Sequence, residues 1–382
     1  ACPVIHDQLN ARGETPLHIA VREGHLEIVN DLLKHAKDAY GGDKGMLMQT
    51  NEEKDTVLHA AVRNSHTELV KLLTEAAPEL SQLANHAEET PLYLAAEKGL
   101  GHFVDQILTC KSSPGISPGY GGPLGRTALH AAVIRDSQAC MERLLSWKQN
   151  LLKAADAYGW TALHYAARFG YVSMVRRILE KDKLVAYIAA DKDDKKTALH
   201  IATSEGQLEV MKVLISECPG CWEMVNSKGQ NILHIAVKSG KEKVMKYILT
   251  NSSLGSLINQ KDADGNTPLH LLVISKCYMP EFIMHPRADK NAFNKKNLTP
   301  LDVLSSSVGL PTIFGGPIER ALVHGGAING RRNLITIDKD DHDTAGKEQV
   351  HVEKCEKQQW QVLAEKCDKQ WQLRAEKCEK QC

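Results

Sequence analysis

The sequence predicts an all-α solenoid of about nine helix-turn-helix units, the last ones degenerate, followed by a C-terminal amphipathic helix. Three observations predict this fold class. A tetrapeptide of Thr, Pro or Ala, Leu and His recurs about every 35 residues, and apolar residues and small residues each keep fixed distances from it. Because one such unit cannot bury its apolar face alone, neighbouring units must stack.

The tetrapeptide starts the first helix of each unit. Thr supplies an N-cap oxygen, and Pro is tolerated at the first helical position because its missing N–H is not needed there. The nine copies begin at Thr15, Thr56, Thr90, Thr127, Thr161, Thr197, Asn231, Thr267 and Thr299. A column of small residues follows and lets neighbouring helices approach closely: Ala20, Ala61, Ala95, Ala132, Ala166, Ala202 and Ala236. Glycines then end the helix, as C′ residues often do: Gly24, Gly99, Gly170, Gly206 and Gly240.

The second helix of each unit is predicted from an apolar stripe with i, i+1, i+4 spacing. Its central column, fourteen residues after each Thr, holds Val29, Val70, Val104, Met141, Val175, Met211 and Met245. Thr74 is the one break in the next column, where the other copies carry Leu or Ile.

These columns resemble the ankyrin repeat, whose period is near 33, over roughly residues 10 to 310. More narrowly, the irregular insertions and the segment 226–234 resemble plant ankyrin proteins of the accelerated-cell-death-six-like family. Members of that family carry a multi-helix membrane domain with a Pro-Gly-Gly motif after the array, and that domain is not visible in this sequence. The resemblance implies a structural hydrogen-bonding role for the seven motif histidines beside the Thr.

The sequence divides into an array at 1–310, a cap or linker at 311–337 and a charged tail at 338–382. Residues 38–55 and 112–125 lengthen two loops and are interpreted as solvated spacers. Gly119 to Gly122 suggest a phosphate-binding loop, but no strand precedes them and no Lys-Ser/Thr follows, so nucleotide binding is excluded. Pro280 is expected to remove the second helix of copy eight, and Leu272 and Leu304 replace the alanine column, as in a C-terminal cap.

The tail contains a second repeat, in which Glu-Lys-Cys recurs every 11 to 12 residues. This spacing places a set of apolar residues on one helical face: Trp360, Leu363, Cys367, Trp371 and Cys378. We expect an amphipathic helix that packs on the array, self-associates or connects to a membrane segment. If a membrane lies nearby, its cysteines are candidates for palmitoylation: Cys355, Cys367, Cys378 and Cys382.

The composition excludes some classes of binding partner and favours one cellular compartment. The chain carries 47 basic and 47 acidic residues, so its zero net charge argues against nucleic acid and anionic membranes as partners. No apolar run approaches the 18 to 20 residues of a spanning helix, which predicts a soluble chain. Ten sparse cysteines favour reduced thiols in the cytoplasm. The chain begins at Ala1 without an initiator methionine or a signal-peptide pattern, which indicates a fragment.

No catalytic set is available without the structural histidines, so we expect no enzyme activity, cofactor or metal. The motif histidines lie on successive units and cannot converge on one ion. Cys218 and Cys221 have the CxxC spacing of redox and zinc sites, but no second ligand pair accompanies them. We interpret them as loop residues, and a thiol-disulfide enzyme is the remote alternative.

What remains is protein binding. The resemblance implies that ankyrin arrays use their loop tips and the exposed side of the first helix as a concave recognition surface. Copies four and five place aromatic, apolar and arginine residues at those positions, the types that dominate interface energetics. This central patch comprises Leu124, Arg126, Ile134, Arg135, Tyr158, Trp160, Arg168 and Phe169. The alternative is that Tyr158 and Trp160 merely cover the neighbouring loop.

The predicted function is therefore a scaffold or adaptor that binds an unidentified protein partner in cytoplasmic signalling. The alternative, implied by the narrower resemblance, is the cytosolic regulatory domain of a plant plasma-membrane ankyrin protein in defence or stress signalling. In that case the chain lies at the cytosolic face of the plasma membrane. It is attached there through a segment outside this sequence or through the tail cysteines Cys355, Cys367 and Cys378.

Overall fold

The structure is a computed structural model that describes residues 8–39, 45–109, 117–307 and 316–330. Residues 1–330 form one compact unit and residues 331–382 a second. The second unit lies outside the described residues, and so does the expected tail helix with its tryptophans and cysteines. The boundaries expected at 310 and 337 stay predictions.

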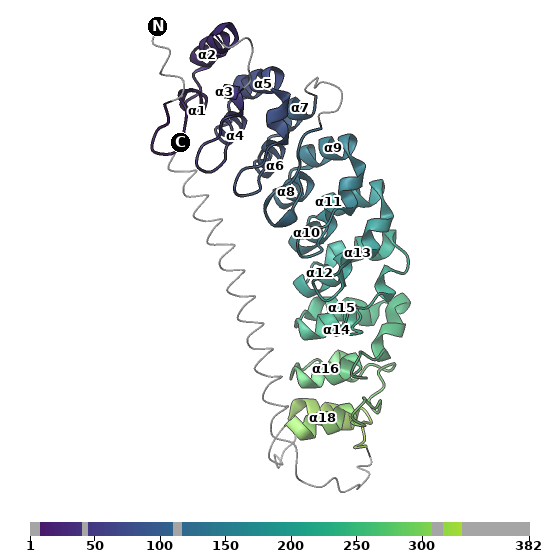
Figure 1. Ribbon diagram of the computed structural model, residues 1–382. Coiled ribbons are helices and arrows are strands. Elements are labelled where there is room, and N and C mark those ends of the chain that lie inside the picture. The colour runs from purple at the N-terminus through teal and green to yellow at the C-terminus, as the bar shows by residue number, and fades with distance from the viewer. Residues whose placement is uncertain (1–7, 40–44, 110–116, 308–315, 331–382) are drawn as a thin grey trace. The chain divides into compact units, whose positions relative to one another are not determined.

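Within the first of these two parts of the chain, each repeat unit forms a pair of antiparallel helices, and successive pairs stack side by side (Figure 1). The first helices are α1 (Pro16–Arg22), α4 (Val57–Arg63), α6 (Pro91–Glu97), α8 (Ala128–Ile134), α10 (Ala162–Phe169), α12 (Ala198–Glu205), α14 (Ile232–Lys238), α16 (Pro268–Ile274) and α18 (Pro300–Ser307). The second helices are α2 (Leu26–Ala39), α5 (Thr67–Ala76), α7 (Gly101–Thr109), α9 (Gln138–Trp147), α11 (Val172–Lys181), α13 (Leu208–Glu217), α15 (Glu242–Thr250), α17 (Pro280–Ile283) and α19 (Pro317–His324). The predicted helix-turn-helix solenoid is confirmed.

Short elements connect these pairs. They are the helical turn α3 (Gly45–Met48) and the 3₁₀ turns η1 (Pro78–Gln82), η2 (Pro123–Gly125), η3 (Gln149–Lys153), η4 (Lys183–Tyr187), η5 (Cys221–Glu223) and η6 (Ser252–Asn259). The strands β1 (Ala189–Ala190) and β2 (Lys196–Thr197) form a two-stranded antiparallel sheet, in which Ala189 pairs with Thr197.

The predicted columns form the core. Each first helix contacts the first helix of the next unit, from α1 to α18, and the small-residue column lies at this contact. Ala132, Ala166 and Ala202 are completely buried there. The second helices bury their apolar stripe against the same core, and Val175 and Met211 are fully enclosed. Because every unit buries its apolar face on its neighbours, the stability of the stack is shared between adjacent units.

Glycine closes several first helices for a conformational reason. Gly170 and Gly206 adopt φ values of 77° and 82°, in the left-handed region that residues with a Cβ rarely enter. The predicted C′ role of these glycines is confirmed.

Two expectations about irregular segments are corrected, and one irregular position is explained. Pro280 does not remove the second helix of copy eight but starts it, because a proline fits the first helical position, and α17 is one short turn. Residues 38–55 are more than a spacer, since α3 buries Leu47 in the core. The break at Thr74 is accommodated because its Oγ1 donates to the Val70 carbonyl, 2.8 Å away.

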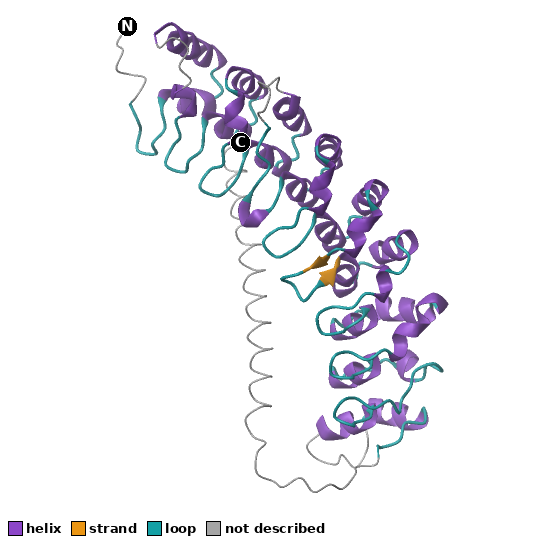
Figure 2. Ribbon diagram, turned by 45° about the vertical axis from the view of Figure 1, so that its right-hand side comes forward, coloured by secondary structure: helices purple, strands orange, loops and turns teal. Residues whose placement is uncertain are grey.

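Long hairpin loops join consecutive units on one side of the helix pairs (Figure 2). Backbone hydrogen bonds of 2.7–3.1 Å connect many of these loops to their neighbours; for example, the Ala157 N–H donates to the Leu124 carbonyl and the Ser227 N–H to the Asp194 carbonyl. The loops therefore form a continuous edge in which one loop positions the next.

Candidate protein-binding surface

The motif histidines hold this edge together. In all seven units, His Nδ1 lies 2.8–2.9 Å from the side-chain oxygen of the Thr or Asn that begins the helix. In six of them, Nε2 faces a backbone carbonyl of the next hairpin loop at 2.9–3.2 Å. The implied structural role is confirmed. Burial lowers the pKa of His130, His164 and His200 to about 4, which keeps these rings neutral at pH 7.

Two sequence columns face each other on the loop side of the first helices. One is the residue just before each Thr, and the other is the residue seven positions after it. In the first two units an arginine of the later column binds a carboxylate of the earlier one. Arg22 binds Glu14 at 2.6 Å, and Arg63 binds Asp55 at 3.0 Å. In these two units the arginine at the loop edge is therefore neutralised by a carboxylate of the same unit.

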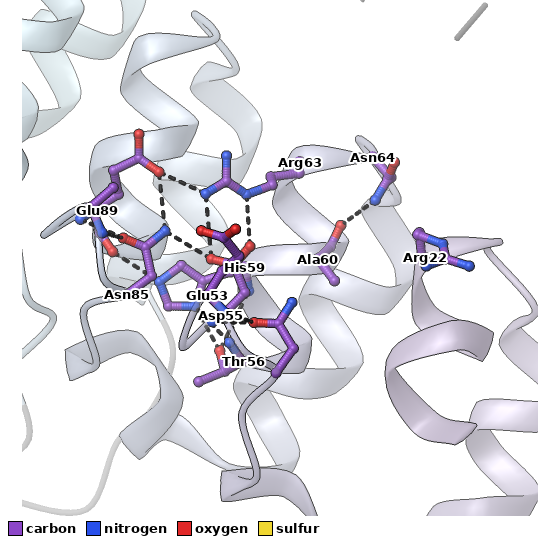
Figure 3. Close-up of polar contacts among 12 residues, drawn as sticks. Arg22, Glu53, Asp55, Thr56, His59, Ala60, Arg63, Asn64, Asn85 and Glu89 are labelled. Carbon is purple, nitrogen blue, oxygen red and sulfur yellow. Dashed lines mark hydrogen bonds and ion pairs between the residues drawn. The ribbon is translucent and has the colours of Figure 1, made fainter. Parts of the chain in front are cut away.

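The Arg63 cluster also spans two units (Figure 3). Its guanidinium donates to the Glu89 carboxylate of the next unit at 2.6 Å, and the Asn85 side-chain amide bridges Asp55 and Glu89 at 2.8 and 3.1 Å. Asp55, Asn85 and Glu89 are buried. Burying carboxylates is costly unless they are paired, so Arg63 is required for this arrangement.

In units four and five the same columns hold arginine with aromatic partners. Arg126 Nε donates to the Tyr165 hydroxyl at 3.1 Å, and its Cζ lies 5.3 Å from the Tyr165 ring centroid. The Tyr165 hydroxyl in turn donates to Asp156 Oδ2 at 2.6 Å. Burial raises the pKa of Tyr165, and the Asp156 carboxylate raises it further, so the hydroxyl stays protonated. Arg126 is thus a half-buried organiser of the central patch.

Trp160 is fixed by contacts with the repeat units on both sides of it. Its Nε1–H donates to Asp193 Oδ2 of the next hairpin at 3.1 Å, and its carbonyl accepts from His130 Nε2 at 3.0 Å. Its ring packs against Tyr165 with centroids 5.2 Å apart, and the Arg168 Cζ lies 5.7 Å from the Trp160 centroid. Trp160 therefore covers the neighbouring loop, as the alternative interpretation expects, and also forms the base on which Arg168 rests.

The eight predicted residues fall into two groups by their exposure to solvent, an outer level and a supporting level. Leu124, Arg135, Arg168 and Phe169 are exposed, and Leu124 and Phe169 keep 45% and 42% of their surface. Arg126, Ile134, Tyr158 and Trp160 are half-buried. All eight lie on adjacent loops and helix ends, so the structure brings them onto one edge. The exposed four form the outer level, and the half-buried four support it.

Four further residues complete the patch and were not predicted. Tyr165 and Asp156 hold Arg126, Asp193 holds Trp160, and Tyr171 lies beside Phe169 with ring centroids 5.6 Å apart. The signal for Tyr165 was in the sequence. It is an aromatic residue directly after the motif histidine, where the other units carry aliphatic side chains. Asp193 becomes a partner of Trp160 only when the loops stack.

The glycines of the second insertion have a structural role. Gly122 lies against the ring of Tyr93, where an added Cβ would overlap the aromatic carbons. The Gly121 carbonyl accepts hydrogen bonds from the Thr90 backbone N–H at 3.1 Å and from Thr90 Oγ1 at 2.9 Å. Close backbone approach, rather than phosphate binding, explains this Gly-rich run.

Cys218 and Cys221 lie in a tight turn, in which the Cys221 N–H donates to the Cys218 carbonyl at 3.2 Å. Both thiols are buried, and burial raises the pKa of Cys221 to about 12. A buried neutral thiol is a poor nucleophile, so this turn packs the loop and does not favour redox chemistry. Over the residues that the structure describes, no group of three or more His, Cys, Asp or Glu side chains is arranged to hold a metal ion.

None of the helices in the described ranges has the length and apolar character needed to cross a bilayer. Paired helices, stacked hairpin loops and an exposed patch on the loop edge define a helical repeat protein of the protein-interaction class. Comparison with protein families gives the particular family. The description "Ankyrin repeats (3 copies)" matches residues 39–118, 92–188, 182–262 and 222–294, and "Ankyrin repeat" matches residues 12–40. The chain belongs to the ankyrin-repeat family.

Several curated proteins share part of this sequence. The chain is 26% identical over 189 residues to "Transient receptor potential cation channel subfamily A member 1 homolog" of Caenorhabditis elegans, covering 48% of this chain and 14% of that protein. It is 35% identical over 107 residues to "SMC5-SMC6 complex localization factor protein 1" of Bos taurus, covering 28% and 10%. It is 30% identical over 203 residues to "Nuclear factor NF-kappa-B p105 subunit" of Mus musculus, covering 53% and 20%. The chain thus spans one fifth or less of the length of these relatives.

Among solved structures, the ankyrin repeat domain of Bcl-3 is similar with a TM-score of 0.45 and 22% sequence identity, covering 81% of this chain and 99% of that one. Ankyrin repeats are typically non-enzymatic protein-interaction modules.

Proposed function

We propose that this chain is a non-enzymatic scaffold that binds a protein partner through the central patch in units four and five. The observation that supports the site is the combination of exposed apolar and cationic groups on a rigid base. Leu124 and Phe169 are exposed, and Arg168 rests on the fixed ring of Trp160. Apolar and arginine side chains held in place lose little conformational entropy on binding, which favours them as interface anchors.

The test begins with proximity labelling, using the full chain as bait to identify a partner. Binding of the purified partner is then measured by calorimetry for the chain and for the double variant Leu124→Ala with Phe169→Ala. Both side chains are exposed, so the variant is expected to keep its melting temperature and to bind at least about tenfold more weakly. The matched control is Leu184→Ala in η4, an equally apolar side chain that is 66% exposed outside the patch. Unchanged affinity in the double variant would refute the site.

We propose signalling as the setting of this interaction, because the chain is similar over part of its length to a nuclear factor subunit and to a cation channel homologue. The cytoplasm is the proposed compartment. A protein partner is favoured over nucleic acid because the chain has zero net charge and its arginines in the patch are few. Localisation of a fluorescent fusion of the full chain tests the compartment, and nuclear or secreted signal would refute it.

A second candidate is the cytosolic regulatory region of a plant membrane protein of the accelerated-cell-death-six-like family, acting in defence or stress signalling. It is supported by the segment 226–234 and by the likeness to a cation channel homologue. The open reading frame past Cys382 separates the candidates. Four apolar spans would favour the membrane protein, and a stop codon would favour the free adaptor.

Membrane association through Cys355, Cys367 and Cys378 belongs to this second candidate, and these cysteines lie outside the described residues. Thioester-specific acyl exchange on the full chain expressed in plant cells measures it directly. Labelling that is lost after replacement of the three cysteines by serine would support attachment at the cytosolic face of the plasma membrane. Absence of labelling would refute this route.

A further inference from the structure

We infer that the partner segment recognised by the central patch presents a carboxylate next to a large apolar side chain, with the carboxylate on Arg168 and the apolar group on Phe169. This inference rests on the proposed function and adds the chemical class of the ligand. The ligand is an acidic peptide segment of a protein, containing Asp or Glu beside Leu, Ile, Phe or Trp.

The array itself shows what this column of arginines binds. Arg22 and Arg63 occupy the same position of the repeat as Arg168, seven residues after the Thr. Each of the first two binds a carboxylate from the column just before the Thr, Glu14 at 2.6 Å and Asp55 at 3.0 Å. A planar guanidinium in this position is therefore directed at the place where a carboxylate lies.

Unit five has the arginine without the carboxylate. Trp160 occupies the column position that holds Glu14 and Asp55 in the first units, so Arg168 stacks over an aromatic ring. Arg168 is exposed, and no carboxylate of the described residues lies within ion-pair distance of it. Stacking leaves the N–H donors at the edge of the guanidinium available, because a cation–π contact uses only its face.

The acidic groups around Arg168 are already engaged. Asp156 accepts from the Tyr165 hydroxyl and from two backbone N–H groups, and Asp193 accepts from Trp160 Nε1 and from Lys196 Nζ at 2.7 Å. Neither is free to rotate onto Arg168 without breaking bonds that hold the patch. A carboxylate supplied by a partner completes in unit five the arrangement that Glu14 and Asp55 complete within units one and two.

The inference that the ligand also carries an apolar side chain comes from Phe169, the residue next to Arg168. Phe169 is 42% exposed beside Arg168 in sequence, and its ring is supported by Tyr171. Arg135 is also exposed and lies near Tyr171, where the adjacent Asp136 partly offsets its charge. Arg168 is thus the principal cation and Phe169 the principal apolar contact. One guanidinium with one aromatic ring fits a short acidic and apolar peptide motif better than a polyanion, which would need an extended row of cations.

The test uses an unbiased display library of twelve-residue peptides selected on the immobilised full chain. The enriched peptides are expected to carry net negative charge and at least one large apolar residue. Fluorescence anisotropy of one enriched peptide then compares the chain with Arg168→Glu, Arg168→Lys and the control Arg176→Glu on α11, an exposed arginine on a second helix. We expect at least about tenfold weaker binding for Arg168→Glu, a smaller loss for Arg168→Lys and unchanged binding for Arg176→Glu.

A second experiment does not depend on the folding of the variants. The enriched peptide is made with Gln and Asn in place of Glu and Asp, and its affinity for the unaltered chain should fall by the same factor as that caused by Arg168→Glu. Enrichment of neutral or basic peptides, absence of any enriched peptide, or equal affinity for the amide peptide overturns the inference. If neutral peptides bind and lose affinity in Leu124→Ala with Phe169→Ala, the proposed function stands and only the acidic class of ligand is refuted.

Discussion

Mild acid should destabilise this array because of its buried histidines. The folded protein holds His130, His164 and His200 neutral, with the pKa lowered to about 4 by burial, whereas an exposed histidine of the unfolded chain has a pKa near 6.5. Below pH 6.5 the unfolded state therefore binds more protons than the folded state. Stability is fully present above pH 6.5 and is lost as the pH falls towards 4.

The size of this effect follows from the two pKa values. Between pH 7.5 and pH 5.5, protonation of the unfolded state lowers the free energy of unfolding by about 1.4 kcal/mol for each of these histidines, or about 4 kcal/mol for the three. Burial also lowers the pKa of His18, His59, His234 and His270, which adds to the loss in the same direction. The lowered pKa of Glu14 acts only below its ordinary value of 4.5 and so lies outside this interval.

The assay is urea unfolding of the full chain, followed by circular dichroism at both pH values. In His164→Asn one buried titrating group is removed, so the difference between pH 7.5 and pH 5.5 should shrink by about 1.4 kcal/mol whatever the variant's absolute stability. His86→Asn is the control, because His86 is an exposed loop residue. The reasoning is refuted if the free energy of unfolding is the same at both pH values, or if both variants keep the full difference.

Three further predictions concern single side chains. Arg63→Ala should lower the free energy of unfolding by about 3–5 kcal/mol because it removes the cation that neutralises two buried carboxylates, and a loss below 1 kcal/mol in urea unfolding would contradict this. Tyr165→Phe should cost about 1–3 kcal/mol, since Asp156 loses its 2.6 Å donor; an unchanged thermal midpoint would count against the network. Gly206→Ala should cost about 1–2 kcal/mol because φ is 82°, while Gly316→Ala, with φ of −59° and open space around it, should stay within about 0.5 kcal/mol; equal effects would disprove the conformational argument.

Much of the candidate site was accessible from the sequence because it follows the repeat. Once the Thr column is aligned, Trp160 and Arg168 occupy positions that face the loop edge, so their place at this edge could be predicted. The sequence did not reveal that Trp160 donates to Asp193, because the two residues meet only when one hairpin stacks on the next. Their contact depends on loop conformation, which periodicity does not encode.

The irregular segments also contain features that could not be predicted from the sequence. A proline in a helix reads as a break, yet Pro280 begins α17 because the chain reaches it from an extended residue, Met279. From the sequence, the segment with Gly121 and Gly122 is interpreted as a solvated spacer, yet these glycines approach Thr90 and Tyr93 closely.

The sequence by itself determined the family, the helix pairs, the N-cap threonines and the structural histidines, because these depend on spacings within one unit and on burial that every unit repeats. Only the tertiary structure decided which charges are neutralised. Glu14 and Asp55 satisfy the arginines of their own units, whereas Arg168 has an aromatic base and, among the residues that the structure describes, no carboxylate partner. Ion pairing requires two side chains to meet within about 4 Å, and the path of each hairpin loop beside its first helix sets that distance.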